Sequence, residues 1–370
     1  MDLENIAVKC KLGDDMRLKY KDSEYTFSEF SYKKDNNYFC ITPEDDTSIE
    51  ICYYPVLQLD DEHDVNNFSY ELFYNKNNYE NNIFQVCIDS QRIGWIFPIN
   101  ALLSSEHDYA NNIYFLKYAY VAIYLLLRDI NSIDEKKLPQ DFNFADHYDK
   151  ENTIFVIDTE NTKQVEDFNI EDYIVSLFKY GYTRNENGNF SPSPIKGIER
   201  LKIRPLSKEL SGNPNINSLF INQFSLAKDN EIIKFHICYQ IIELLISKVF
   251  EHKLKTIIKN LSSDSENLFD LREDLSTIAA EKERIKYLFE TYTTCETSDK
   301  TQIEIACKQF LELNQKKCLG NHYYNLYSVR CMLVHKLYLL NDGSYEILRK
   351  INEHLLNITI DMLFSFHFPQ

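Results

Sequence analysis

Two residues with the chemistry of phosphate handling lie in one apolar stretch near the end of the chain. Arg330 and His335 enclose the sequence Cys-Met-Leu-Val and follow an aromatic start at Tyr327. A charged side chain is costly to bury, so each needs a partner or a ligand. Cleaving an RNA phosphodiester requires a base for the 2′-hydroxyl proton, an acid for the leaving oxygen and a cation for the phosphate charge. Histidine titrates in the range that suits the first two roles, and the planar guanidinium of arginine suits the third.

A carboxylate is available on a second helical segment. Apolar residues at helical spacing predict a long helix from Ile232 to Ile257, and residues 235–243 within it read Phe-His-Ile-Cys-Tyr-Gln-Ile-Ile-Glu. Glu243 is therefore a candidate partner for the arginine. If Arg330 and His335 serve only structure, we expect Arg330 to form an ion pair with an acid such as Glu243, and His335 to be a satisfied core or interface histidine.

These two segments resemble the HEPN superfamily of helical bundles, many of which are metal-independent endoribonucleases that act as dimers. Arg330 and His335 match the family's R-x-x-x-x-H signature, and Tyr239-Gln-Ile-Ile-Glu243 resembles the Y-Q-x-x-E stretch of some bacterial members, including the Apea-like antiviral type. The resemblance covers about residues 217–368. It implies that His335 acts as general acid or base, that Arg330 holds the scissile phosphate, and that Glu243 orients Arg330 or positions a water. No cofactor and no metal are implied.

The same resemblance implies partners. We expect the C-terminal bundle to form a homodimer that places two copies of Arg330 and His335 in one cleft. The substrate would be single-stranded or looped RNA, with transfer RNA as one candidate, because unpaired nucleotides can bend to the geometry of in-line attack. Antiviral defence or a toxin is the expected setting, with a phage-derived or other protein trigger acting at the N-terminal domain.

The R-x-x-x-x-H pattern by itself is weak, because Arg349 and His354 form a second copy of it. That copy encloses Lys, Asn and Glu and is expected on a solvated face, so we favour Arg330 and His335. Cys331 stands where many family members have a polar residue such as Asn. On an ideal helix Arg330 and His335 lie about 140° apart, so a flexible arginine, a distorted helix or a site shared between two chains must bring them together.

Two other function classes remain open. The bundle could be a non-catalytic module that dimerises or docks a partner, with Arg330 and His335 serving structure. The other class is a metal-dependent nuclease in the N-terminal part. Asp158-x-Glu160-x-x-Lys163 resembles the acid, acid, lysine arrangement of such nucleases, although its spacing is one residue too long. Weaker metal candidates are the acidic run 60–64 and a cysteine and histidine set that lacks paired zinc spacing. That set consists of Cys295, Cys307, Cys318 and His322.

Composition limits the classes of protein further. The 370 residues include only eight glycines, and neither a G-x-G-x-x-G nor a P-loop sequence occurs, which argues against the usual nucleotide cradles. Of the net charge of −17, residues 1–214 carry −15 and residues 215–370 carry −2. The first part should therefore repel a polyanion and act as a brake on RNA binding. A basic series in between fits a solvated linker better than an RNA contact: Lys196, Arg200, Lys202, Arg204 and Lys208.

The periodicity predicts an α+β protein in three parts. An N-terminal α+β sensor or regulatory domain is expected over 1–184, a Pro- and Gly-containing connector over 185–216, and an all-α bundle over 217–370. Strands are expected at 38–41, 49–54, 84–88, 93–96 and 152–157, and helices at 112–130 and 168–182. Beyond the helix at 232–257, the bundle should contain helices at 275–292, 300–316 behind a Ser298 cap, 321–340 and 345–366.

The cysteines and the longest apolar run indicate in which cellular compartment the protein is expected. Nine cysteines form no C-x-x-C pair and no secretory signal precedes them, which predicts reduced thiols in the cytoplasm. The longest uncharged apolar run, Tyr118–Leu127, is ten residues long, whereas a membrane span needs about 20. We therefore expect a buried helix there and no membrane partner.

Overall fold

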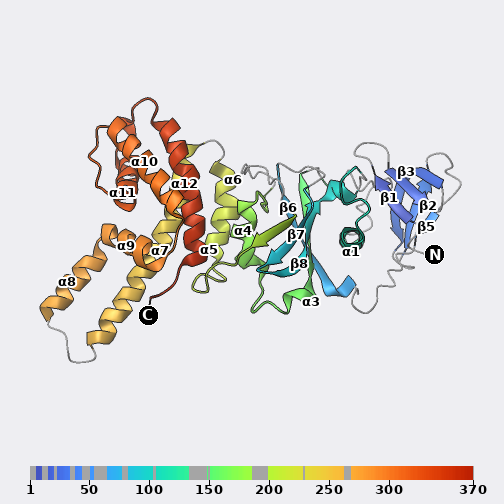
Figure 1. Ribbon diagram of the computed structural model, residues 1–370, viewed down its shortest axis with the longest axis horizontal. Coiled ribbons are helices and arrows are strands. Elements are labelled where there is room, and N and C mark those ends of the chain that lie inside the picture. Colours follow the sequence, from blue (N-terminus) through green and yellow to red (C-terminus); the bar gives the residue numbers. More distant parts are fainter. Residues whose placement is uncertain are drawn as a thin grey trace. The chain divides into compact units, whose positions relative to one another are not determined.

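The computed structural model has strands in its N-terminal half and mostly helices in its C-terminal half, which confirms the α+β class (Figure 1). It describes the strands before residue 54 by their backbone, and then residues 65–76, 82–102, 106–132, 148, 151–185, 199–227, 230–261 and 268–369. The chain divides into two compact units. Unit 1 comprises Met1–Asn169, Leu177–Glu186 and Phe190–Ile203, and unit 2 comprises Ile170–Ser176, Asn187–Asn189 and Arg204–Gln370.

Unit 1 contains two five-stranded sheets. The first is antiparallel throughout and follows chain order. Its strands are β1 (Ile6–Cys10), β2 (Met16–Tyr20), β3 (Ser23–Lys33), β4 (Tyr38–Pro43) and β5 (Ile51–Tyr53). Antiparallel neighbours need only short connections, and this explains how five strands fit into so short a stretch of chain.

The second sheet is mixed and has the strand order β10-β7-β8-β9-β6. Its strands are β6 (Phe68–Tyr74), β7 (Phe84–Ile88), β8 (Gln91–Pro98), β9 (Asn152–Asp158) and β10 (Arg200–Ile203). Only β10 pairs in parallel, with β7. The sequence pattern places β10 in the expected connector, yet Leu201 and Ile203 are buried in this unit while Arg200 and Lys202 are exposed.

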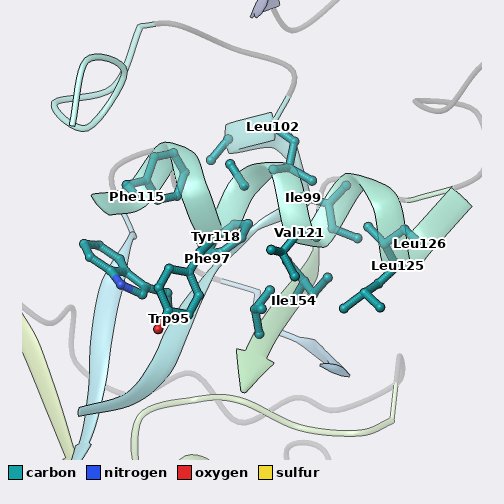
Figure 2. Packing of buried hydrophobic residues seen from close by; sticks show 14 of the residues in the cluster. Trp95, Phe97, Ile99, Leu102, Phe115, Tyr118, Val121, Leu125, Leu126 and Ile154 are labelled. Atoms are coloured by element: carbon teal, nitrogen blue, oxygen red, sulfur yellow. The ribbon is translucent and has the colours of Figure 1, made fainter. Parts of the chain in front are cut away.

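Helix α1 (Ile113–Ser132) supplies the core of unit 1 by packing on this sheet (Figure 2). Its apolar residues meet side chains from β8 and β9, and the rings of Phe97 and Phe115 pack edge to face at 5.1 Å. The labelled core residues are Trp95, Phe97, Ile99, Leu102, Phe115, Tyr118, Val121, Leu125, Leu126 and Ile154. The expectation of a buried helix at the apolar run is confirmed. Short helices α3 (Thr159–Thr162) and α4 (Ile174–Lys179) follow β9.

Unit 2 is built from helices that pack on the long α7 (Glu231–Leu261). Helix α12 (Ser344–Ser365) packs against both α7 and α10 (Thr297–Leu313), and α11 (His322–His335) packs against α10 and α9 (Glu281–Tyr287) (Figure 1). The remaining helices are α5 (Pro214–Ser218), α6 (Phe224–Ala227) and α8 (Leu268–Ala279). None of the helices in the described ranges is both long and apolar enough to cross a membrane.

Three sequence expectations for unit 2 are wrong in detail. The helix expected over 275–292 is interrupted at Ala280, whose extended backbone (φ −71°, ψ 117°) separates α8 from α9. Helix α10 begins at Thr297, so Ser298 lies inside its first turn and does not cap it. The helix expected over 321–340 ends at His335, because Lys336 leaves the helical region at φ −138° before a 3₁₀ turn at Leu337–Leu339.

Candidate functional site

Arg330 projects from the third turn of α11 toward α7. Its Nη2 atom donates a hydrogen bond to Oε1 of Glu243 at 2.9 Å. The side chain of Arg330 is 22% exposed and that of Glu243 is 44% exposed. The expected partners are therefore in contact, and the guanidinium still reaches solvent with donors that this bond leaves unused.

The guanidinium of Arg330 lies over the aromatic ring of Tyr239. The Cζ atom of Arg330 lies 5.5 Å from the ring centroid of Tyr239, which is one turn before Glu243 on α7. This ring is buried, and its hydroxyl donates to Oε1 of Glu281 at 3.4 Å, at the start of α9. A cation over a ring face is attracted by the ring quadrupole. The guanidinium of Arg330 thus contacts two residues of α7, and Glu281 of α9 hydrogen-bonds the hydroxyl of one of them, Tyr239.

The electrostatics of this cluster favour a fixed positive charge. Partial burial alone would lower the pKa of the Arg330 guanidinium, but the hydrogen bond to Glu243 and the negative charge of Glu281 outweigh it, so the pKa is raised. Burial, with the charge of Glu281 added, raises the pKa of the Tyr239 hydroxyl. Tyr239 is therefore a neutral support at neutral pH, and Arg330 remains a cation at every accessible pH.

His335 stands apart from this cluster. It is the last residue of α11, its side chain is exposed, and it makes no hydrogen bond or ion pair with any residue that the structure describes. Within one chain the structure therefore brings Arg330 to Glu243 but not to His335. The angular separation expected for five helical residues persists, because α11 is regular up to its end.

Several residues of the cluster carried no role in the sequence analysis. Tyr239 could have been recognised as a cation-binding ring from its spacing of four residues to Glu243, which places both on one helix face. His236 lies a further turn back on the same face and interacts electrostatically with Arg330. Glu281 gave no sequence signal, because only the packing of α9 on α7 brings it to the Tyr239 hydroxyl.

Cys331 also belongs to the neighbourhood of the arginine. Burial, together with the neighbouring Cys331 side chain, raises the pKa of the hydroxyl of Tyr327, one turn earlier on α11. The thiol thus takes part in a local contact on α11.

The second R-x-x-x-x-H sequence forms two separate ion pairs. Arg349 is exposed and bonds Glu346 on its own helix, at 2.8 Å. His354 bonds Asp299 of α10 through Nδ1 at 2.7 Å. Because each residue has a different partner on a different element, the structure gives no shared site for them.

The metal candidates find no support in the described part of the chain, where no group of three His, Cys, Asp or Glu side chains is arranged to hold an ion. Asp158 caps α3 by accepting from the backbone N–H groups of Glu160 and Asn161, both at 3.1 Å. Lys163 forms a surface ion pair with Glu160. His322 packs its ring on Phe289. The acidic run 60–64 lies outside the described residues.

The basic series of the expected connector is exposed wherever it is described. Arg200, Lys202, Arg204 and Lys208 all face solvent, and Lys196 lies outside the described residues.

The six described cysteines are free thiols: Cys87, Cys238, Cys295, Cys307, Cys318 and Cys331.

Comparisons of the chain with protein-family models, with curated proteins and with solved structures find no match.

Proposed function

We propose that unit 2 is a metal-independent endoribonuclease of the HEPN type. The observation that carries this proposal is the guanidinium of Arg330, which rests on the Tyr239 ring, is tied to Glu243 and remains partly exposed. A cation held in this way is pre-positioned for a phosphate group and needs little rearrangement when charge develops in the transition state.

The residues take distinct parts in this proposal. Arg330 holds the scissile phosphate and stabilises the charge that develops on it. His335 transfers a proton, as acid or base, and Glu243 orients Arg330 or positions a water. The substrate is single-stranded or looped RNA, with transfer RNA as one candidate. Attack of the 2′-hydroxyl on phosphorus forms a 2′,3′-cyclic phosphate and releases a 5′-hydroxyl.

The proposal includes a homodimer through unit 2, because His335 makes no contact with Arg330 in its own chain. Apolar side chains around His335 are exposed, and Tyr338 is the most exposed of them at 83%. The others are Val334, Leu337 and Leu339. A second copy covering this face would remove apolar area from water and bring a second His335 to the same region. We place the activity in antiviral defence or toxicity, with the N-terminal part as the sensor of a phage-derived or other protein trigger.

Arg330→Ala and His335→Ala test this function. Each should lower cleavage of single-stranded RNA by at least about a hundredfold, because each removes a group that acts in the transition state. Cleavage should persist in excess chelator and leave cyclic phosphate ends. Arg349→Ala and His367→Ala change exposed residues of the same types and should leave cleavage unaltered. Cleavage that survives Arg330→Ala in a folded chain contradicts the proposal.

The exposed apolar face also favours one alternative, a non-catalytic module that docks another protein there. The same experiment separates the two. Docking without catalysis predicts that the wild-type chain cleaves no RNA in the presence of its trigger, and that Arg330→Ala affects only folding. A chelator-sensitive cleavage that persists in both alanine variants selects a metal-dependent nuclease in unit 1 instead.

A further inference from the structure

His236 lies on the same face of α7 as the two residues that hold Arg330. It precedes Tyr239 by three positions and Glu243 by seven, which are spacings of one and two helical turns. Tyr239 and Glu243 both contact the guanidinium of Arg330. His236 is therefore the next residue, toward the start of α7, on the helix face that contacts the guanidinium of Arg330.

The imidazole of His236 is accessible and is not engaged by its surroundings. Its side chain is half-buried, and its ring meets the neighbouring Phe235 edge to face with the centroids 6.2 Å apart. It forms no hydrogen bond with the described residues, so both ring nitrogens are available to a ligand.

The charges that act on His236 come from two helices. Burial and the positive charge of Arg330 on α11 lower the pKa of the imidazole, and Glu243 on its own helix opposes them. The net shift is downward from 6.5, so the ring is mostly neutral at pH 7. A neutral imidazole accepts a proton, which is the property required of a general base.

We propose that His236 is a second catalytic imidazole and serves as the general base of the ribonuclease site. This inference rests on the proposed function and adds a residue to it. The neutral ring of His236 takes the proton of the 2′-hydroxyl, and the O2′–P bond forms. The bond from phosphorus to the 5′-oxygen then breaks, and His335, acting as the general acid, supplies the proton that this oxygen needs. Between bond formation and bond breaking, the Arg330 cation stabilises the extra negative charge on the phosphate oxygens.

This assignment also resolves the angular problem of the R-x-x-x-x-H sequence. On a regular helix His335 lies about 140° around the axis from Arg330. His236 lies on the face of α7 whose Tyr239 and Glu243 contact Arg330. The base and the phosphate-binding cation then belong to one chain, and only the acid has to be brought in.

His236→Gln in the full-length chain is the first test. It should reduce cleavage by about a hundredfold. In the wild type the rate should fall as the pH drops through a pKa below 6.5, since protonation disables the base, and this limb of the profile should vanish in His236→Gln. His367→Gln is the matched control and should leave rate and profile unchanged. If His236→Gln keeps the wild-type rate while Arg330→Ala abolishes cleavage, His236 has no such role and the proposed function stands. If Arg330→Ala also cleaves normally, the proposed function itself fails.

A second test does not depend on activity. The pKa of His236 can be followed by NMR titration of the imidazole carbon-bound protons in the full-length chain. Arg330→Gln removes the neighbouring positive charge and should raise this pKa, and Glu243→Gln removes the opposing negative charge and should lower it further. A pKa that does not move in either folded variant would show that His236 is not part of the cluster.

Discussion

At the scale of single residues, Glu243 is expected to act by positioning Arg330. The oxygen that accepts from Nη2 survives in Glu243→Gln, whereas Glu243→Ala removes it. We expect Glu243→Gln to keep most RNA cleavage and Glu243→Ala to lose about tenfold in kcat/KM, equivalent to about 1.4 kcal/mol. Because the pair is partly exposed, neither change should alter the free energy of unfolding by more than about 1 kcal/mol. Steady-state kinetics with thermal unfolding checks this. Equal losses in both variants would contradict a positioning role.

The residues of this cluster could be predicted from the sequence only in part. The pairing of Arg330 with Glu243 was predictable because both charged groups lie among apolar residues in helices and each needs a partner. The same helical spacing also contained His236 and Tyr239. Glu281 could not be predicted, because its contact with Tyr239 spans 42 positions and depends on the break at Ala280 that starts α9. Local patterns carry no information about such a tertiary contact.

At the scale of elements, Gly94 controls how closely β8 and β9 approach. A Cβ at this position would collide with the backbone oxygen of Val156 and would touch the ring of Phe155. We expect Gly94→Ala to lower the stability of unit 1 by about 1–3 kcal/mol, because the paired strands must move apart. Trp95 is the single tryptophan of the chain and is fully buried beside Gly94. Its fluorescence in a denaturant titration reports this unit.

Gly320→Ala serves as the control for that measurement. Gly320 lies in unit 2 at φ +99°, with no atom near the site of an added Cβ. The substitution is strained by its backbone angle, yet it should leave the midpoint of the Trp95 transition unchanged. A Gly94→Ala midpoint equal to that of the wild type would mean that β8 and β9 are not packed as tightly as the backbone indicates.

Elements with strong periodicity were predictable, and their ends were less so. Helices α1, α7 and α12 and strands β7 and β9 are confirmed at the expected positions. The helices repeat apolar residues over several turns, and the two strands are short apolar runs bounded by turn residues. Strand β10 is only four residues long and lies close to Pro and Gly residues, so its alternation is too short to recognise. The end of α11 at His335 depends on a change of backbone angle at Lys336 that no residue type there requires.

At the scale of the whole molecule, the excess negative charge lies before residue 170, whereas the two compact units alternate along the chain between residues 170 and 203. Residues 1–169 contain 32 acidic and 15 basic side chains, which equals the full net charge of −17, and residues 170–370 contain 25 of each. The segment Ile170–Ser176 belongs to the compact helical unit. Its buried Asp172 accepts hydrogen bonds from Ser211 Oγ at 2.7 Å and from the Gly212 N–H at 2.8 Å. A boundary at residue 217 would discard these contacts.

A chain that starts at Ile170 tests the proposed brake once circular dichroism shows that it is folded, because it retains Leu177–Glu186 and Phe190–Ile203 without the rest of unit 1. It keeps Asp172 with its partners and loses the entire excess of negative charge, which repels RNA over a Debye length of about 8–10 Å. We expect this chain to cleave single-stranded RNA faster than the full-length chain, most clearly at low salt, where the repulsion is least screened. A chain starting at residue 217 should unfold more readily, which circular dichroism on heating would detect. If the folded 170–370 chain cleaves more slowly than the full-length chain, the acidic part supports catalysis and the brake is refuted.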